Sequence, residues 1–314
     1  MAEDQSLPRS GIGRSKYWII VPNSVTAAAV FCAFYSVVES LKGFQCLTLN
    51  HVDASAQHFD LAALSILWGF LFDNLDGRLA RMVKVTSEFG KEFDSLADAL
   101  TFGMAPMVLV YGWCYGSSVP MQNLLLICTF VFVLCGAVRL ARFNVQSHKP
   151  PDKNARSQPI THFFVGMPIP IAAFLIASIV HFSPVPLSMR PGHIQLLGHS
   201  IPVTAAFVLM LVLLLALALL MVSTVPYYSF KGFGGNKLGI WGSALVPGTI
   251  VLVILSGSPP TVLAMGVFLA LMGPLFLFGT LLRPGKTNMR SELVLPAGGT
   301  TGTPSSPGSP NLQS

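Results

Sequence analysis

The sequence predicts an all-α integral membrane protein. Hydrophobic residues make up 52% of the 314-residue chain, charged residues make up only 10%, and the mean hydropathy is +0.64. This is more apolar than one soluble core requires. The apolar segments are long enough to cross a bilayer as helices and too long for the strands of a membrane barrel. We expect about eight transmembrane helices, at residues 17–38, 61–81, 93–113, 122–142, 161–182, 201–222, 242–257 and 260–282.

Two of these segments are less regular than the others, and the segment at 17–38 resembles a signal peptide in its position. Residues 242–257 form a short segment, and residues 161–182 contain Pro168 and Pro170. The first segment follows basic residues, as a signal peptide does, but its apolar run of about 21 residues is longer than a signal peptide requires. We therefore expect it to be retained as a helix.

The composition divides the chain into three regions. The first residues are polar, and the last are rich in Gly, Pro, Ser and Thr, a composition typical of disordered segments. We expect a polar cytoplasmic N-terminal segment at 1–16, a transmembrane domain at 17–283 with its last two helices, about 242–282, as an extension, and a disordered cytoplasmic tail at 284–314.

The distribution of basic residues predicts the orientation. With both termini in the cytoplasm, 17 of the 19 Lys and Arg residues fall on the cytoplasmic side, and only Lys42 and Arg190 fall outside. This agrees with the positive-inside rule. The net charge of +6 is therefore explained by topology and by attraction to anionic membrane lipid, and we expect no nucleic-acid partner.

Acidic residues are concentrated in one stretch, DNLDGRLARMVKVTSEFGKEFDSLAD. It holds six of the 13 acidic residues of the chain. Asp73 and Asp76 are three residues apart, and Asp94 and Asp98 are four apart, so each pair shares one face of a helix. Because a short loop joins the two helices as antiparallel neighbours, we expect the four carboxylates to converge at the cytoplasmic edge of the membrane.

The composition around these aspartates predicts a metal and diphosphate site. Two carboxylates 4 Å apart repel each other by roughly 4 kcal/mol at an effective dielectric constant of 20, and carboxylate oxygens are ligands that Mg²⁺, Mn²⁺ and Ca²⁺ prefer. Small residues let a bulky ligand approach the backbone, and arginines bind phosphate. The small residues here are Gly77, Ala80 and Gly90, and the arginines are Arg78 and Arg81.

Other interpretations of the acidic stretch remain open from these residues alone. A solvated helix end is the simplest, but it gives no reason for the spacing of four aspartates. A cation pathway through a transporter is a second, although such sites favour the middle of the membrane between repeated halves. An isoprenoid transferase, which also binds a diphosphate through metal ions, is a third.

The pattern Asp73-x2-Asp76-Gly77-x2-Ala80-Arg81-x8-Gly90-x3-Asp94-x3-Asp98 is similar at all eight fixed positions to the signature of the CDP-alcohol phosphotransferase family. These enzymes displace CMP from a CDP-linked lipid with an alcohol. The resemblance implies a core of six transmembrane helices, with the active site at the cytoplasmic membrane surface. Isoprenoid transferases lack the Gly-x2-Ala-Arg element.

The resemblance also implies roles for the signature residues. Asp73, Asp76 and Asp94 resemble the metal ligands. Asp98 resembles the residue that helps to hold a second metal ion and takes the proton from the incoming hydroxyl. The residues that resemble those admitting and holding the CDP moiety are Gly77, Arg81 and Gly90, with Ala80 and Arg78 beside them.

The acceptor alcohol has to be inferred from other segments. The stretches VPNSVTAAAVFCAFYSVV, CGAVRLARFNV, FVGMPIPIAA and STVPYYSFK resemble the corresponding parts of phosphatidylserine synthases. That resemblance implies CDP-diacylglycerol and L-serine as substrates, Mn²⁺ or Mg²⁺ as the cofactor, a bacterial inner membrane and a possible homodimer. Inositol phosphate and glycerol 3-phosphate remain alternative acceptors. The cations that we expect to bind the serine carboxylate are Arg139, Arg142 and Lys231.

Overall fold

The computed structural model describes most of the expected membrane domain. The described residues are 12–83, 88–116, 121–147, 163–190, 192–196, 199–228, 248–249, 251–253 and 255–281. The chain divides into two compact units, Met1–Leu277 and Phe278–Ser314, and the packing below is that of the first unit. The expected tail at 284–314 lies outside the described residues.

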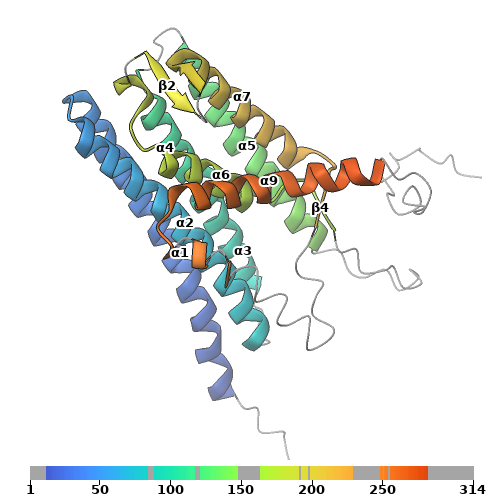
Figure 1. The fold of residues 1–314 in the computed structure, drawn as a ribbon. Helices are drawn as coiled ribbons and strands as arrows, with labels where there is room; N and C mark the ends of the chain where they lie inside the picture. The colour runs from blue at the N-terminus through green and yellow to red at the C-terminus, as the bar shows by residue number, and fades with distance from the viewer. Residues whose placement is uncertain are drawn as a thin grey trace, which may run out of the picture. The chain divides into compact units, whose positions relative to one another are not determined.

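Helices make up nearly all of the regular structure (Figure 1). They are α1 (Ile12–Thr48), α2 (Val52–Val83), α3 (Glu88–Asp98), the π-helix η1 (Ala99–Met104), α4 (Ala105–Cys114), α5 (Gln122–Ser147), α6 (Ile169–Phe182), the 3₁₀ helix η3 (Leu187–Met189), α7 (Val203–Val222) and α9 (Pro259–Leu281). In the described ranges, the strands form two short antiparallel pairs. These are β1 (Phe163–Val165) with β4 (Pro226–Tyr228), and β2 (His193–Leu196) with β3 (His199–Pro202). The all-α prediction is confirmed.

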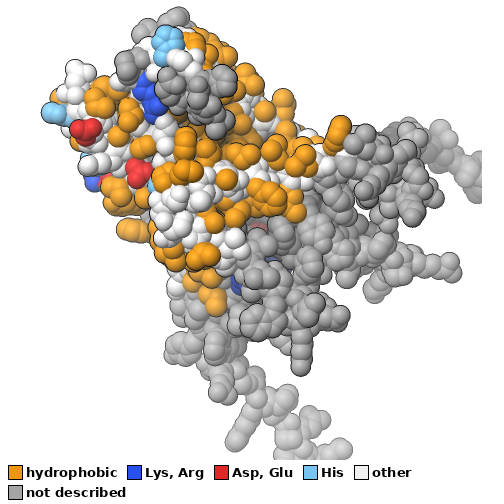
Figure 2. Space-filling model, in the orientation of Figure 1, with side chains coloured by type: hydrophobic (Ala, Val, Ile, Leu, Met, Phe, Trp, Pro, Cys, Tyr) orange, Lys and Arg blue, Asp and Glu red, His pale blue; other side chains and the backbone are white. Residues whose placement is uncertain are grey.

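Five helical segments of the described chain are long and apolar enough to cross a membrane. They are Pro22–Thr48, Glu88–Cys114, Gln122–Val145, Ile169–Met189 and Val203–Val222. The protein is therefore an integral membrane protein. Hydrophobic side chains also cover much of the described surface in Figure 2, as expected for helices that face lipid.

The number of these segments is smaller than the eight helices expected, for three reasons. The helix expected at 61–81 is part of α2, which is long enough but contains aspartates and other polar residues that reduce its hydropathy. The last expected helix corresponds to a shorter apolar segment, Pro259–Leu275. Half of the residues of the expected helix at 242–257 lie outside the described residues.

The fifth helix begins later than the sequence pattern predicted. Its first residue is Ile169, because Pro168 has an extended backbone with ψ near 133° and ends the preceding segment. Residues Phe163–Val165 pair with β4 instead of forming a helical turn. Gly166 turns the chain between the end of β1 and the start of α6. Its φ is +84°, and a Cβ at this position would collide with the carbonyl oxygen of Met221. Glycine is required at this turn.

The antiparallel helices α1 and α2 pack closely along their length (Figure 1). The buried ring of Phe59 on α2 lies between Gly43 on α1 and Gly112 on α4, and a Cβ at either glycine would lie 3.1 Å from that ring. The hydroxyl of Ser55 donates a hydrogen bond of 2.8 Å to the carbonyl of Gly43. Small residues and a serine hydroxyl thus let the helices approach each other, as is common in membranes.

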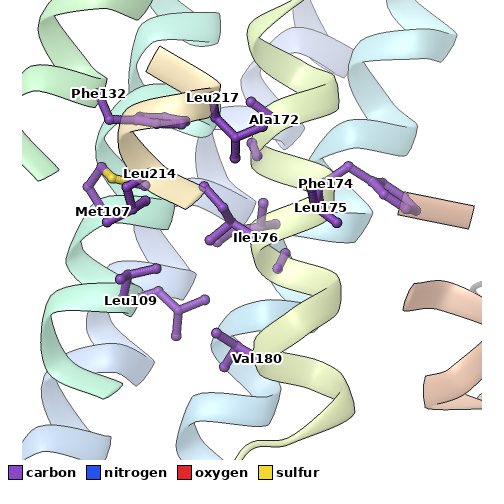
Figure 3. Packing of buried hydrophobic residues seen from close by; sticks show 14 of the residues in the cluster. Met107, Leu109, Phe132, Ala172, Phe174, Leu175, Ile176, Val180, Leu214 and Leu217 are labelled. Carbon is purple, nitrogen blue, oxygen red and sulfur yellow. The ribbon is translucent and has the colours of Figure 1, made fainter. Parts of the chain in front are cut away.

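A hydrophobic core joins the remaining helices (Figure 3). Met107 and Leu109 from α4 and Phe132 from α5 face Ile176 from α6 and Leu214 from α7, and all five are buried. The π-helix η1 continues directly from α3 and contacts α1, α5 and α6. Its first residue comes directly after Asp98, and π-helical turns, although rare, occur frequently at functional sites.

Candidate active site

Aspartates from two helices converge as the sequence predicted. Asp73 and Asp76 lie near the end of α2, and Asp94 lies on α3. One carboxylate oxygen from each of these three lies within 4.8 Å of the other two. The carboxyl group of Asp98, the last residue of α3, is within hydrogen-bonding reach of the Asp73 carboxyl group. The four signature carboxyl groups therefore form one cluster.

A residue of the first helix holds one of these carboxylates. The hydroxyl of Thr26 on α1 donates a hydrogen bond of 2.7 Å to Oδ2 of Asp76, and both residues are buried, with relative exposures of 5% and 4%. Thr26 belongs to the stretch VPNSVTAAAVFCAFYSVV, which entered the sequence analysis only through its resemblance to phosphatidylserine synthases. Its partner, 50 positions away in the chain, had no signal in the sequence.

The aspartates line a cavity of about 270 Å³. Its wall is formed by α2, α3, α5 and the start of α6. Besides the four aspartates, the lining residues are Asn74, Gly77, Arg139, Leu140, Phe143, Pro168 and Pro170. The prolines that delay the start of α6 therefore also shape the site, a role that their sequence pattern did not reveal.

Arg139 is the one cation among the described residues that line this cavity. It lies half-buried on α5, and its Nε is fully buried with no hydrogen-bond partner among the described residues. Its charge interacts favourably with Asp98. A buried polar atom without a partner is costly in a folded protein, so Arg139 carries an unused donor beside the cavity that it lines. Arg142, one turn further along α5, is exposed and does not line the cavity.

Gly77 lies on the wall of the cavity. A Cβ built on Gly77 would meet no atom within 4 Å, so the helix backbone is uncovered there. Gly90 lies on α3, and Arg78 is half-buried on α2. The backbone of Ala80 and Arg81 continues α2, but their side chains lie outside the described set, as does all of Lys231.

A hydrogen bond beside the cavity joins two of the helices that line it. The side-chain amide of Asn144 on α5 donates a hydrogen bond of 3.1 Å to the hydroxyl of Ser95 on α3. Ser95 follows Asp94 directly, and Asn144 follows the lining residue Phe143. The bond therefore fixes α5, which carries Arg139, against the helix that carries two of the aspartates.

The donor set fits a hard divalent cation. Carboxylate oxygens from Asp73, Asp76 and Asp94 are close enough together to ligate one ion. Mg²⁺ and Mn²⁺ take oxygen ligands of this kind, whereas no His or Cys belongs to this cluster of described residues. Without a cation or a shared proton, so many carboxylates would repel one another.

Comparison with known proteins places this site within a matched region. The model of a family described as CDP-alcohol phosphatidyltransferase matches residues 19–228. A CDP-diacylglycerol–serine O-phosphatidyltransferase of Helicobacter pylori is 32% identical over 215 residues, which cover 68% of this chain and 73% of that protein. A protein of the same name from Methanocaldococcus jannaschii is 31% identical over 208 residues, covering 66% and 76%. An archaetidylserine synthase of Methanothermobacter thermautotrophicus is 30% identical over 203 residues, covering 64% and 70%.

Proposed function

Since the chain belongs to the CDP-alcohol phosphatidyltransferase family, we propose that it transfers the phosphatidyl group of CDP-diacylglycerol to the hydroxyl of L-serine and releases CMP. The observation that carries this proposal is the convergence of four signature aspartates in one cavity beside a half-buried arginine. Two of the three relatives share one name and the third is named for a different lipid, but all three names contain serine. This favours serine over inositol phosphate or glycerol 3-phosphate.

In this proposal the aspartate cluster holds the metal ions. Asp73, Asp76 and Asp94 ligate one divalent ion, and Asp98 helps to hold a second. The residue types fit either Mn²⁺ or Mg²⁺. When bound, such ions offset the negative charge of the diphosphate and of the leaving CMP.

The CDP-linked lipid binds beside this cluster. Gly77 leaves the backbone of α2 uncovered at the cavity, so a bulky nucleotide can approach it closely. Arg81 supplies positive charge to the diphosphate, since a guanidinium binds phosphate oxygens in a fixed geometry. The remaining residues to which we assign donor binding are Arg78, Ala80 and Gly90.

Serine binds between Asp98 and Arg139. The serine oxygen forms a bond to the phosphorus of the phosphatidyl group, the bond from that phosphorus to the CMP oxygen breaks, and the hydroxyl proton passes to the Asp98 carboxylate. The unpartnered Nε of Arg139 donates a hydrogen bond to the serine carboxylate. Arg142 and Lys231 are the further cations to which we assign a contribution to serine binding.

We also propose an orientation in the membrane, a host membrane, an oligomeric state and domain bounds for the enzyme. Both termini and the active site face the cytoplasm, since 17 of the 19 basic residues then lie on that side. The membrane is a bacterial inner membrane, and the protein forms a homodimer. Residues 17–283 form the transferase domain, with 242–282 as an extension and flanking segments at 1–16 and 284–314.

The acceptor is tested by CMP release from purified protein in detergent. CDP-diacylglycerol and Mn²⁺ are supplied with L-serine, inositol phosphate or glycerol 3-phosphate in separate reactions. We expect CMP release only in the reaction that contains L-serine, together with formation of phosphatidylserine. Release with another alcohol would keep the family reaction and refute serine as the acceptor. No release with any acceptor, from protein that remains folded, would refute the proposed transfer.

A further inference from the structure

A second cavity lies at the opposite end of α6 from the aspartates. Pro168 and Pro170 at the start of α6 line the aspartate cavity, whereas Ile179, Phe182 and Ser183 at its end line a cavity of about 220 Å³. Since an α-helix rises 1.5 Å per residue, the two cavities are about 20 Å apart. The second cavity is therefore not part of the site described above.

The walls of the second cavity are almost entirely apolar. Trp113 from α4, Leu209 and Leu213 from α7, and Leu263 from α9 line it. Leu209 is 57% exposed and Phe182 is 39% exposed, so the cavity opens onto the surface of helices that we assign to the membrane. Its volume exceeds that of an apolar cavity of about 150 Å³ that holds benzene, and so it has room for a segment of an acyl chain.

Among the described residues that line this cavity, Arg190 is the one that carries a charge. Its Nε donates to the carbonyl of Val185 at 3.1 Å, and its Nη2 donates to the carbonyls of Val185 at 3.0 Å and Ser183 at 3.2 Å. These bonds fix the guanidinium beside the end of α6. Its Nη1 makes no hydrogen bond to any other described residue, and this half-buried side chain therefore has donors left for an anion.

We propose that this cavity binds one phospholipid of the bilayer, with the lipid phosphate on Arg190 and part of one acyl chain along the apolar residues of α7. A free inorganic anion would leave the apolar walls without a partner, and an uncharged lipid would leave the charge of the guanidinium without a counterion. A phospholipid satisfies both. The site is separate from the proposed transfer, because it lies at the other end of α6 from the aspartates.

The first experiment compares lipids on the unmodified protein. The full chain is purified in detergent, stripped of lipid, and incubated with phosphatidylglycerol or with diacylglycerol of the same chains, which lacks the phosphate. Native mass spectrometry counts bound molecules, and thermal unfolding is recorded in parallel. We expect one bound phosphatidylglycerol per chain and a higher Tm, with at least tenfold weaker retention of diacylglycerol. Equal retention of the two lipids would overturn the proposal.

Two variants locate that lipid, and one matched variant serves as the control. Ala206→Phe fills the cavity from α7 and should abolish the bound phosphatidylglycerol. Val212→Phe, at an exposed position of α7 outside the cavity, should keep it. Arg190→Met should remove the preference for phosphatidylglycerol over diacylglycerol. All three variants should retain CMP release. Retention of the lipid by Ala206→Phe would refute this site.

Discussion

The hydroxyl of Thr26 lies 2.7 Å from Oδ2 of Asp76 and donates a hydrogen bond to it, so that α1 holds a carboxylate of α2 at the edge of the aspartate cavity. The same hydroxyl lies 3.2 Å from the carbonyl oxygen of Pro22. The bond restricts the orientation of the Asp76 carboxylate. Groups that orient metal ligands in this way commonly affect metal affinity strongly.

Replacing Thr26 should therefore weaken metal binding. We expect Thr26→Val, which keeps the shape but loses the hydroxyl, to reduce Mn²⁺ affinity by roughly 10- to 100-fold. Thr26→Ser should stay close to the unmodified protein, because it retains the donor. Mn²⁺ binding is measured by electron paramagnetic resonance on detergent-purified protein, with no substrate present. Equal Mn²⁺ affinity in both variants would show that the hydrogen bond does not orient a ligand.

Gly77 should affect function without supporting the fold. Alanine is favoured over glycine inside a helix by about 1 kcal/mol, and a Cβ at position 77 meets no other atom within 4 Å. We therefore expect Gly77→Ala to have an unchanged or slightly higher Tm but a clearly higher KM for CDP-diacylglycerol. Thermal unfolding and CMP-release kinetics measure the two effects.

Gly166→Ala is the matched variant for this prediction, because its glycine serves the fold instead. A Cβ there would collide with the Met221 carbonyl oxygen at a positive φ, so its Tm should fall by several degrees. A loss of stability in Gly77→Ala would contradict our assignment of that residue to the ligand.

Arg139 and Arg142 lie one turn apart on α5 and differ in their surroundings. Only Arg139 lines the cavity and has a buried, unpartnered nitrogen. Hydrogen bonds to charged groups contribute about 1.5–3 kcal/mol. We therefore expect Arg139→Met to raise the KM for L-serine by roughly 10- to 100-fold, with a much smaller change in the KM for CDP-diacylglycerol. Steady-state kinetics with each substrate varied in turn separate these effects.

Arg142→Met provides the comparison for that measurement. It removes the same charge from the same helix at an exposed position, so its KM for L-serine should change by less than about threefold. If both variants raised this KM equally, positive charge near the membrane surface, and not a specific contact from Arg139, would explain serine binding.

Sequence reasoning predicted the central features of the site because they depend on local spacing. Asp73 and Asp76 share a helix face through their three-residue separation, as do Asp94 and Asp98 through four. The short connection between α2 and α3 then leaves little freedom in how the pairs meet. The all-α membrane fold followed equally directly from the length of the apolar segments.

The features that sequence reasoning missed depend on contacts between distant residues. The bond from Thr26 to Asp76 and the bond from Asn144 to Ser95 join residues about 50 positions apart, and no local pattern indicates such partners. The delayed start of α6 was missed because hydropathy continues smoothly through residues 161–168, although Pro168 prevents the helix from beginning there. The π-helix after Asp98 has no recognisable sequence signal.

The most direct test of the proposed chemistry compares Asp98→Asn with Asp53→Asn. Both substitutions remove one negative charge, but Asp53 is an exposed residue at the start of α2, away from the cavity. Serine-dependent CMP release is measured for each variant, and thermal unfolding and binding of CDP-diacylglycerol confirm that the protein remains intact. We predict that Asp98→Asn loses roughly 10²- to 10⁴-fold in turnover, with donor binding retained and Asp53→Asn unaffected. Full turnover in Asp98→Asn, or equal losses in the two variants, would contradict the assignment of the aspartate cluster as the active site.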